Sequence, residues 1–303
     1  MTREDDMGFD YYRAGGFHSF KAAVDKQGKL SAYQNHFITF SMDGTTPVSS
    51  GNIDKAEFPA NVTANQRMVQ SLIASKIPTG PWRAPGSNVI AFCVQSFLNE
   101  CAVAANRDHV EFLVELMGEP RKLPPDPFGG VFNTGRAVAV IKSVAERSGW
   151  GKKMAAGRGL GLAFHFSHQG HFAEVADVSV DANKKITVHK VWVVADIGPI
   201  VNLSSAENQC QGSVVDAVST ATGLKITFEN GRVEQSNFDN YRVLRINEAP
   251  QIQVEIVKSS EAPGGIGEPG TSALMPAVAN AVYAATGVRL RKLPIKTDLL
   301  RST

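Results

Sequence analysis

The chain has 303 residues, of which 43% are apolar, and its 31 basic and 29 acidic side chains leave a net charge of +2. This apolar content suffices for a large core, which we expect to be divided between two subdomains because single cores stop growing near this size. Charges of one sign do not cluster, so the sequence argues against a nucleic-acid or membrane-surface binding protein, which needs a concentrated positive field.

The cysteines are few and odd in number: Cys93, Cys101 and Cys210, with no Cys-x-x-Cys pair. This set predicts neither a disulfide framework nor an iron–sulfur cluster held by this chain. Apolar runs stay well short of the roughly 20 residues that span a bilayer. The charges among residues 1–20 argue against a signal-peptide core there. We therefore expect no direct membrane span, and the compartment stays open.

The first third of the chain predicts strands followed by a loop. Residues 11–40 alternate loosely between apolar and polar side chains, which indicates a β-hairpin with its turn at 25–28. Residues 68–74 form a short amphipathic segment, and 78–86 is rich in proline and glycine, as expected of a loop.

A helix is expected directly after this loop. Ser87 or Asn88 can cap it, because a side-chain oxygen there accepts from an unpaired first-turn N–H group. Apolar side chains from Val89 to Cys101 then recur at helical spacing, which predicts one buried stripe. Both cysteines of this region lie on the stripe, so we interpret them as core residues.

The middle of the chain predicts a linker, a helix and a hairpin. Three prolines within 123–130 indicate the linker, and 138–150 has a helical pattern that ends near Gly149 or Gly151. From residue 160 the pattern changes to the period of two that is typical of strands, with a turn at 181–184.

The last third predicts further mixed elements. A break at 196–199 precedes a helix that we expect Ser204 or Ser205 to cap and Gly223 to end. Asn-Gly within 229–232 indicates a tight hairpin turn, because both residues tolerate positive φ. Alternation at 252–256 then predicts one more strand.

These elements do not alternate as regular βαβ units, so we expect an α+β fold with mixed sheets and packed helices. The expected division is a first subdomain at 1–122, a linker at 123–135 and a second subdomain at 136–303.

Glu268 is the most conspicuous single carboxylate. It lies in the segment 263–270, which contains four glycines and two prolines and precedes the apolar run 273–285. Glycines let a backbone approach a ligand closely, prolines stiffen its path, and a helix start favours an anion. The residues alone also fit a simple turn whose Glu complements the helix dipole.

Arg83 is the second candidate, in the sequence Trp-Arg-Ala-Pro-Gly at 82–86. Its planar fork of donors suits a phosphate or a pterin carbonyl, at the mouth of a helix that itself favours an anion. A surface turn in which Arg83 pairs with a carboxylate is the alternative.

His165, His168 and His171 invite a metal-site interpretation. Their segment continues into an alternating strand, which would place His165 and His168 on opposite faces. We therefore expect no metal site formed by these histidines.

Three separated motifs share one resemblance. GGIGEPGTSALMPAVANAVYAATG at 264–287 resembles the C-terminal signature of the large, molybdenum-binding subunit of the xanthine dehydrogenase and aldehyde oxidase family. PTGPWRAPGSNVIAFCVQSFLNE at 78–100 resembles the pterin-contacting loop and helix of that family, in the version found in isoquinoline 1-oxidoreductase beta subunits. TREDDM at 2–7, with Arg13 beyond it, resembles the strand that leads into the substrate-facing wall.

The resemblance implies roles for individual residues. Glu268 would be the catalytic base beside the metal, and no protein side chain would ligate the molybdenum, which the pterin holds. The substrate side would include Arg13 and Pro85, although an Arg between tyrosines and glycines also fits a hairpin residue lying over aromatic surface. The residues expected to bind the cofactor are Arg83, Ala84, Gly86, Gln209, Gly212 and Gly267.

The resemblance also implies a cofactor and partners. The cofactor would be molybdopterin, in its cytosine dinucleotide form, carrying molybdenum, and 2Fe-2S clusters would lie on a small partner subunit. The Met-Gly-Gln-Gly-like and Gly-Gly-Phe-Gly segments of such large subunits do not occur here. We therefore expect a complementary N-terminal half of the large subunit as a further partner.

The expected reaction is the hydroxylation of an aldehyde or an N-heteroaromatic small molecule with oxygen from water. The alternative is a non-catalytic scaffold or a truncated remnant that binds no cofactor alone.

Overall fold

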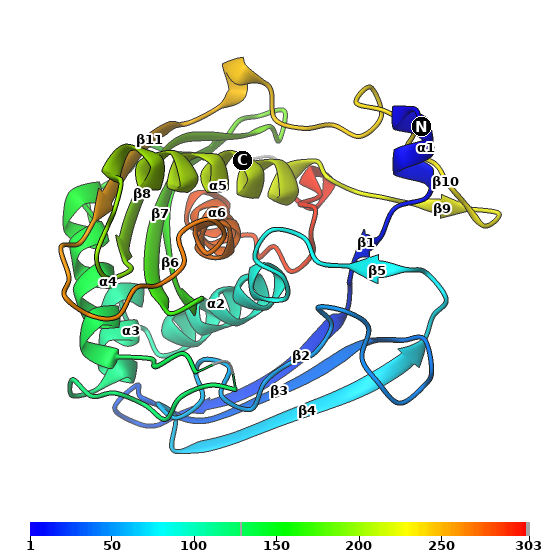
Figure 1. The fold of residues 1–303 in the computed structure, drawn as a ribbon. Coiled ribbons are helices and arrows are strands. Elements are labelled where there is room, and N and C mark those ends of the chain that lie inside the picture. Colours follow the sequence, from blue (N-terminus) through cyan, green and yellow to red (C-terminus); the bar gives the residue numbers. More distant parts are fainter. Residues whose placement is uncertain (128, 301–303) are drawn as a thin grey trace.

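A four-stranded sheet forms the centre of the protein (Figure 1). The computed structural model describes residues 1–127 and 129–300, apart from the side chain of Leu299. The strands are β6 (Arg158–Ser167), β7 (Gly170–Val180), β8 (Ile186–Asp196) and β11 (Gln251–Ile256). Neighbours β6, β7 and β8 are antiparallel, and β11 joins β8 in parallel. The hairpin predicted around 181–184 and the strand predicted at 252–256 are confirmed.

Helices cover both faces of this sheet (Figure 1). One face packs against α4, which in turn contacts α3, and the other packs against α6, which contacts α5 and α2. The bounds are α2 (Ser87–Ala104), α3 (His109–Met117), α4 (Thr134–Ser148), α5 (Leu203–Thr222) and α6 (Gly270–Thr286). A sheet covered on both sides explains why its strands are almost continuously buried.

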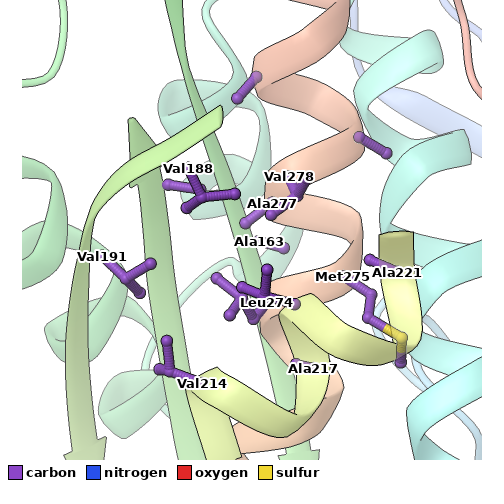
Figure 2. Close-up of a cluster of buried hydrophobic side chains, with 14 of the residues drawn as sticks. Ala163, Val188, Val191, Val214, Ala217, Ala221, Leu274, Met275, Ala277 and Val278 are labelled. Carbon is purple, nitrogen blue, oxygen red and sulfur yellow. The ribbon is translucent and has the colours of Figure 1, made fainter. Parts of the chain in front are cut away.

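Successive side chains of β8 serve opposite cores, as the period of two requires. Val191 and Val193 pack with α5 and α6, whereas Trp192 and Val194 pack with α3 and α4. Figure 2 shows the first of these cores, in which Val191 and Val214 approach Leu274.

Close contact between α6 and β6 depends on glycine. A Cβ atom at Gly161 would lie 2.1 Å from the carbonyl oxygen of Ala277 and 2.2 Å from the backbone nitrogen of Ala281. A Cβ atom at Gly159 would lie 2.6 Å from the carbonyl oxygen of Ala281. The helix backbone therefore lies directly on the strand backbone at these two positions, which fixes α6 relative to the sheet.

A second sheet lies on the far side of α2 (Figure 1). Its strands are β2 (Phe17–Val24), β3 (Leu30–Ser41) and β4 (Asn65–Ala74). The predicted hairpin is confirmed, since β2 and β3 are antiparallel around the turn at 25–28. The amphipathic segment 68–74 belongs to β4, which pairs with β3 in parallel.

Short elements complete the fold. They are α1 (Arg3–Gly8), β1 (Tyr12–Arg13), β5 (Thr79–Gly80), β9 (Phe228–Glu229), β10 (Arg232–Val233) and the 3-10 helices η1 (Ile246–Glu248) and η2 (Thr297–Leu299). Asn230 and Gly231 have positive φ values of 49° and 78° between β9 and β10, which confirms the predicted Asn-Gly turn.

The helix starts differ from the sequence-based expectation. Gly86 is the N-cap of α2, without a side-chain cap, and Asn88 instead donates to the carbonyl oxygen of Arg83 at 2.7 Å. Asn202, not Ser204 or Ser205, caps α5 and accepts from the Ser205 N–H group. The cap of α5 is therefore a favoured side chain two or three positions earlier than expected, whereas α2 begins at a glycine that tertiary contacts hold in place.

The predicted single stripe on α2 is also wrong. Residues all around the helix are buried, including polar Asn88, Gln95 and Asn99, because α2 is enclosed by α6, α3 and the strands on either side.

Gly223 ends α5, but with φ of −143° rather than a left-handed conformation.

The fold class is α+β with mixed sheets, as predicted. The division into subdomains at 1–122 and 136–303 stays a prediction. Helix α2 of the first predicted subdomain packs on α6 of the second. Among the described residues no single helix is long and apolar enough to cross a bilayer. The pair of α2 and α3, bent by 107°, meets that test only by length and composition.

We predict that Gly161→Ala destabilises the protein by about 2 kcal/mol or more, because its methyl group would overlap the α6 backbone. Urea unfolding followed by circular dichroism measures this change. Gly8→Ala is the matched control, since nothing lies within 4 Å of a Cβ atom there, and it should change stability by less than about 0.5 kcal/mol. Equal stability of the two variants would contradict the close contact.

Candidate functional site

Arg83 joins three segments that are far apart in the sequence. Its Nε and Nη2 atoms donate to the carbonyl oxygen of Gly267 at 2.9 and 2.6 Å. Nη2 also donates to the carbonyl and side-chain oxygens of Gln209 at 3.1 and 3.2 Å. Nη1 lies 3.9 Å from the Asp216 carboxylate and would be 3.5 Å from a Cβ atom at Gly212. The structure thus brings together four of the six residues predicted to bind the cofactor.

This arrangement fits neither original interpretation of Arg83 fully. The side chain is 23% exposed, and its shortest bonds go to backbone carbonyl oxygens rather than to a carboxylate. It is therefore more than a surface turn residue. Its observed contacts hold the 82–86 loop against α5 and the Glu268 loop.

The remaining cofactor-binding candidates, Ala84 and Gly86, lie in the same loop in an unusual conformation. Ala84 is fully buried with φ of +56°, and Gly86 has φ of +72°. A left-handed conformation at a residue with a Cβ atom costs about 1 to 2 kcal/mol, so the surrounding structure must hold it. The hydrogen bond from Asn88 to the carbonyl oxygen of Arg83 is one such constraint.

Glu268 lies beside His168, a contact that sequence reasoning missed. The His168 Nε2 atom is 3.2 Å from the Glu268 Oε2 atom, with the two side chains 41% and 43% exposed. On its other side, His168 Nδ1 is 2.6 Å from the Ser167 hydroxyl group. Gly265 N–H donates to the His168 carbonyl oxygen at 2.7 Å, which ties the two loops together.

The sequence feature that could have indicated this contact is the turn at 168–170. His168 and Gln169 both have positive φ, and they connect β6 to β7 instead of continuing a strand. The sequence His-Gln-Gly is compatible with such a turn, but only the fold places it opposite residues 265–268.

The other two histidines are buried away from Glu268. Burial lowers the pKa of His165 to about 4 and, together with the charge of Arg136, that of His171 to about 3. His171 Nε2 accepts from the backbone N–H group of Asn133 at 3.1 Å. Within the part of the chain that the structure describes, no group of three His, Cys, Asp or Glu side chains is placed to hold a metal ion.

Arg13 lies over an aromatic ring. Its guanidinium carbon is 5.1 Å from the ring centre of Trp82, and β1 pairs with β5 so that Arg13 faces Gly80. Burial lowers the pKa of Arg13, an effect that Asp216 and Tyr241 oppose. The predicted aromatic contact is present, although Trp82 provides it, and a substrate role for Arg13 stays a prediction.

Pro85 borders a cavity of about 630 Å³. Ser87 lines the same cavity, as do Ser167 and His168 from the β6–β7 turn and Gly265 from the Glu268 loop. The cavity therefore adjoins the pair formed by His168 and Glu268.

Behind the Glu268 loop lies a second carboxyl group, Glu174, which is completely buried on β7. Neither of its oxygens has a hydrogen-bond partner among the described residues, and the same holds for the hydroxyl groups of Ser213, Thr271 and Ser272. A Cβ atom at Gly270 would lie 3.5 Å from Glu174 Oε1 and 3.4 Å from Ser213 Oγ. Burial raises the pKa of Glu174 well above its ordinary value, because the low-dielectric surroundings at the start of α6 favour the uncharged carboxyl group.

We predict a pH-dependent stability from Glu174. Between the ordinary pKa of Glu and the raised pKa of Glu174, the folded protein keeps the Glu174 proton whereas the unfolded chain releases it. The free energy of unfolding therefore falls as pH rises through this range, by up to about 1.4 kcal/mol per pH unit. Glu174→Gln should remove this decline. Urea unfolding at about pH 5 and about pH 7.5 tests it, with exposed Glu146→Gln as control. Parallel pH profiles for wild type and Glu174→Gln would contradict the prediction.

Comparison with known proteins gives the family. Residues 135–250 match the model of a molybdopterin cofactor-binding domain. The chain is 30% identical to isoquinoline 1-oxidoreductase subunit beta of Brevundimonas diminuta, over 72% of this chain and 26% of that protein. It is 29% identical to a membrane-bound aldehyde dehydrogenase (pyrroloquinoline-quinone) of Gluconacetobacter polyoxogenes, over 99% of this chain and 42% of that protein.

Solved structures agree in fold. Quinoline 2-oxidoreductase from Pseudomonas putida 86 superposes with a TM-score of 0.78 at 12% identity, covering 99% of this chain and 63% of that one. Aldehyde oxidoreductase from Desulfovibrio gigas gives a TM-score of 0.74 at 12% identity, covering 97% and 49%. The fold is therefore that of molybdenum hydroxylase large subunits.

The chain contains a molybdopterin cofactor-binding domain of the xanthine dehydrogenase and aldehyde oxidoreductase family, and it is homologous to part of the large subunit of those enzymes. It spans 42% of the Gluconacetobacter polyoxogenes protein and 26% of the Brevundimonas diminuta protein, so it matches less than half of either.

Proposed function

We propose that this chain forms part of the molybdopterin site of a hydroxylase that acts on aldehydes or N-heteroaromatic compounds, with Glu268 as its base. The observation that carries the proposal is the Arg83 junction. Arg83 holds the loop bearing Glu268 through the Gly267 carbonyl oxygen, at the point where the starts of α2 and α6 meet α5.

The residues at this junction fit an anionic, phosphate-bearing cofactor. Neither α2 nor α6 has a side-chain cap at its N-terminus, and uncapped helix starts favour an anion. The glycines at 212 and 267 leave the backbone open to close approach, with only the ends of Arg83 and Gln209 near them. The cytosine dinucleotide form of the cofactor belongs to this proposal.

Each residue has a proposed task. When bound, the cofactor would supply the oxygen-transfer and electron-accepting chemistry, which side chains alone lack. Glu268 would accept the proton released in that step, as a general base within hydrogen-bonding reach. His168, 3.2 Å from Glu268 Oε2, would orient the carboxylate so that Oε1 faces the reacting atoms. Pro85 and Arg13 would contact the substrate.

Further chains would complete the enzyme. We propose that the rest of the large subunit, which this chain does not match, supplies the other cofactor contacts, and that 2Fe-2S clusters on a small subunit take the electrons. A non-catalytic scaffold remains the alternative, and cofactor analysis of the complex separates the two.

We predict that Glu268→Gln lowers turnover by about 100-fold or more in the complex purified with co-expressed partner chains, because a general base is lost. Molybdenum and pterin content should stay unchanged, since Gln keeps the size of the side chain. Glu261→Gln, which removes an exposed ion pair with Lys122 in the same part of the chain, is the control and should keep its turnover. Comparable turnover of Glu268→Gln at equal metal loading would rule out the base.

We predict that Arg83→Lys lowers cofactor occupancy. Lys keeps the charge but cannot bridge Gly267 and Gln209 with one planar group, so the three segments would separate. Molybdenum per chain, measured by mass spectrometry, and pterin per chain, measured by fluorescence after oxidation, provide the test.

Arg291→Lys is the matched control, because Arg291 makes a similar two-fold contact with Glu100 at an exposed site. Its occupancy should equal that of wild type. Occupancy of Arg83→Lys equal to this control would defeat the proposed role of Arg83. Finding a quinone instead of a pterin would overturn the proposed cofactor.

A further inference from the structure

The cavity beside His168 has the size of a small-molecule site. Its volume of about 630 Å³ lies within the range of ordinary ligand pockets. Most of its walls come from residues 54–61 between β3 and β4, residues 123–127 and 130–132 before α4, and the β6–β7 turn, and Pro85, Ser87 and Gly265 complete them. His168 lines the cavity and lies 3.2 Å from Glu268, so a molecule in this cavity would be separated from the proposed base by this one side chain.

Aromatic rings form one wall of the cavity. Phe132 lies at its centre, with ring centroids 5.8 Å from Phe58 and 5.2 Å from Phe166, the latter edge to face. Such a wall suits a planar aromatic ligand, and the faces of aromatic rings also attract cations.

The charged residues of the cavity are acidic. Asp54, Glu57 and Asp126 line it, and no Lys or Arg is found among its described lining residues. Asp54 accepts from the backbone N–H group of Ala56 at 2.6 Å, whereas no hydrogen bond or ion pair reaches the Glu57 carboxyl group from the described residues. Arg121 lies nearby, but it donates to backbone carbonyl oxygens, including that of Asn61.

Glu57 responds to this environment. It borders the cavity but is densely surrounded by protein, and burial, followed by the charges of Asp54 and Asp126, raises its pKa to about 8. Among the described lining residues, Asp54, Asp126 and His168 are the further titratable side chains. A cation placed there would favour the ionised form of Glu57, so cation binding and proton release are linked.

We propose that this cavity is the substrate-access site of the hydroxylase and that it selects aromatic cations, such as N-alkylated nitrogen heterocycles, over neutral or anionic aromatics of the same size. The aromatic wall would stack on the ring, and the Glu57 and Asp54 carboxylates would balance its charge. An anionic aromatic would meet like charges and be rejected. The substrate role rests on the function proposed above, whereas the binding preference is a property of this chain alone.

The test is a binding experiment on the full chain without cofactor. N-methylquinolinium is the cationic probe, quinoline at alkaline pH is its neutral counterpart, and 2-naphthoate is the anion. Isothermal titration calorimetry at low salt should show the cation binding at least about 10-fold more tightly than quinoline, because charge attraction is strong near a partly buried carboxylate. No binding of 2-naphthoate is expected.

Glu57→Gln should weaken cation binding by about 5-fold to 10-fold and leave quinoline binding unchanged, because it removes a charge but little volume. Exposed Glu111→Gln on α3 is the control and should match wild type. From about pH 6.5 to about pH 9 the wild-type affinity for the cation should rise as Glu57 ionises, whereas the Glu57→Gln profile should lose that rise.

Equal affinity for N-methylquinolinium and quinoline would overturn the proposal, as would a Glu57→Gln variant that binds the cation like wild type. If that variant does not fold, the ligand preference and pH profile of the wild-type chain still decide. A complex that lacks molybdopterin but shows the cation preference would overturn the function proposed above and leave only the binding site. A loaded, active complex without this preference would overturn the cavity proposal alone.

Discussion

The guanidinium group of Arg83 is the interaction on which the candidate site depends. It bonds the carbonyl oxygen of Gly267, 184 residues away, and that of Gln209, 126 residues away. Gln209 lies within α5, whereas Gly267 lies in a loop rich in glycine and proline that precedes α6. One planar donor group satisfies several of their acceptors, which in a part-buried place would each cost about 1 to 3 kcal/mol if left unpaired. A second, longer route runs from Ser87 at the start of α2 through Ser167 and His168 to Glu268.

The position of α6 on the central sheet is fixed because its backbone packs directly on the backbone of β6. α6 lies on β6 at Gly159 and Gly161, which sets the position of its first residue, Gly270, and hence of the loop before it. Buried polar groups without hydrogen-bond partners among the described residues lie at the same place, with the Glu174 carboxyl group and the Ser213 hydroxyl group next to Gly270. Polar groups buried without partners are expensive in ordinary cores and are usually explained by a functional site. Their concentration behind the Glu268 loop therefore agrees with the proposed location.

Three glutamates illustrate how surroundings divide one chemical group into different roles. Glu268 is almost half exposed and contacts His168. Glu174 is completely buried in the core, where burial raises its pKa and favours the neutral form. Glu57 lies at a cavity wall with other acidic groups, where burial and like charge raise its pKa. The first environment suits proton transfer to solvent-facing ligands, the second suits packing beneath a helix start, and the third suits charge selection.

The sequence by itself determined the local structure and the family. Turns at 25–28 and 181–184, the strand periodicity and the loop before α6 follow from side-chain type over a few residues, and three motifs carry the resemblance. Tertiary structure alone decided the cap of α2, the burial of that helix on every side, and the contact of His168 with Glu268. The reason is physical: periodicity reports which face of one element is apolar, whereas these features depend on which distant backbone the fold brings against it.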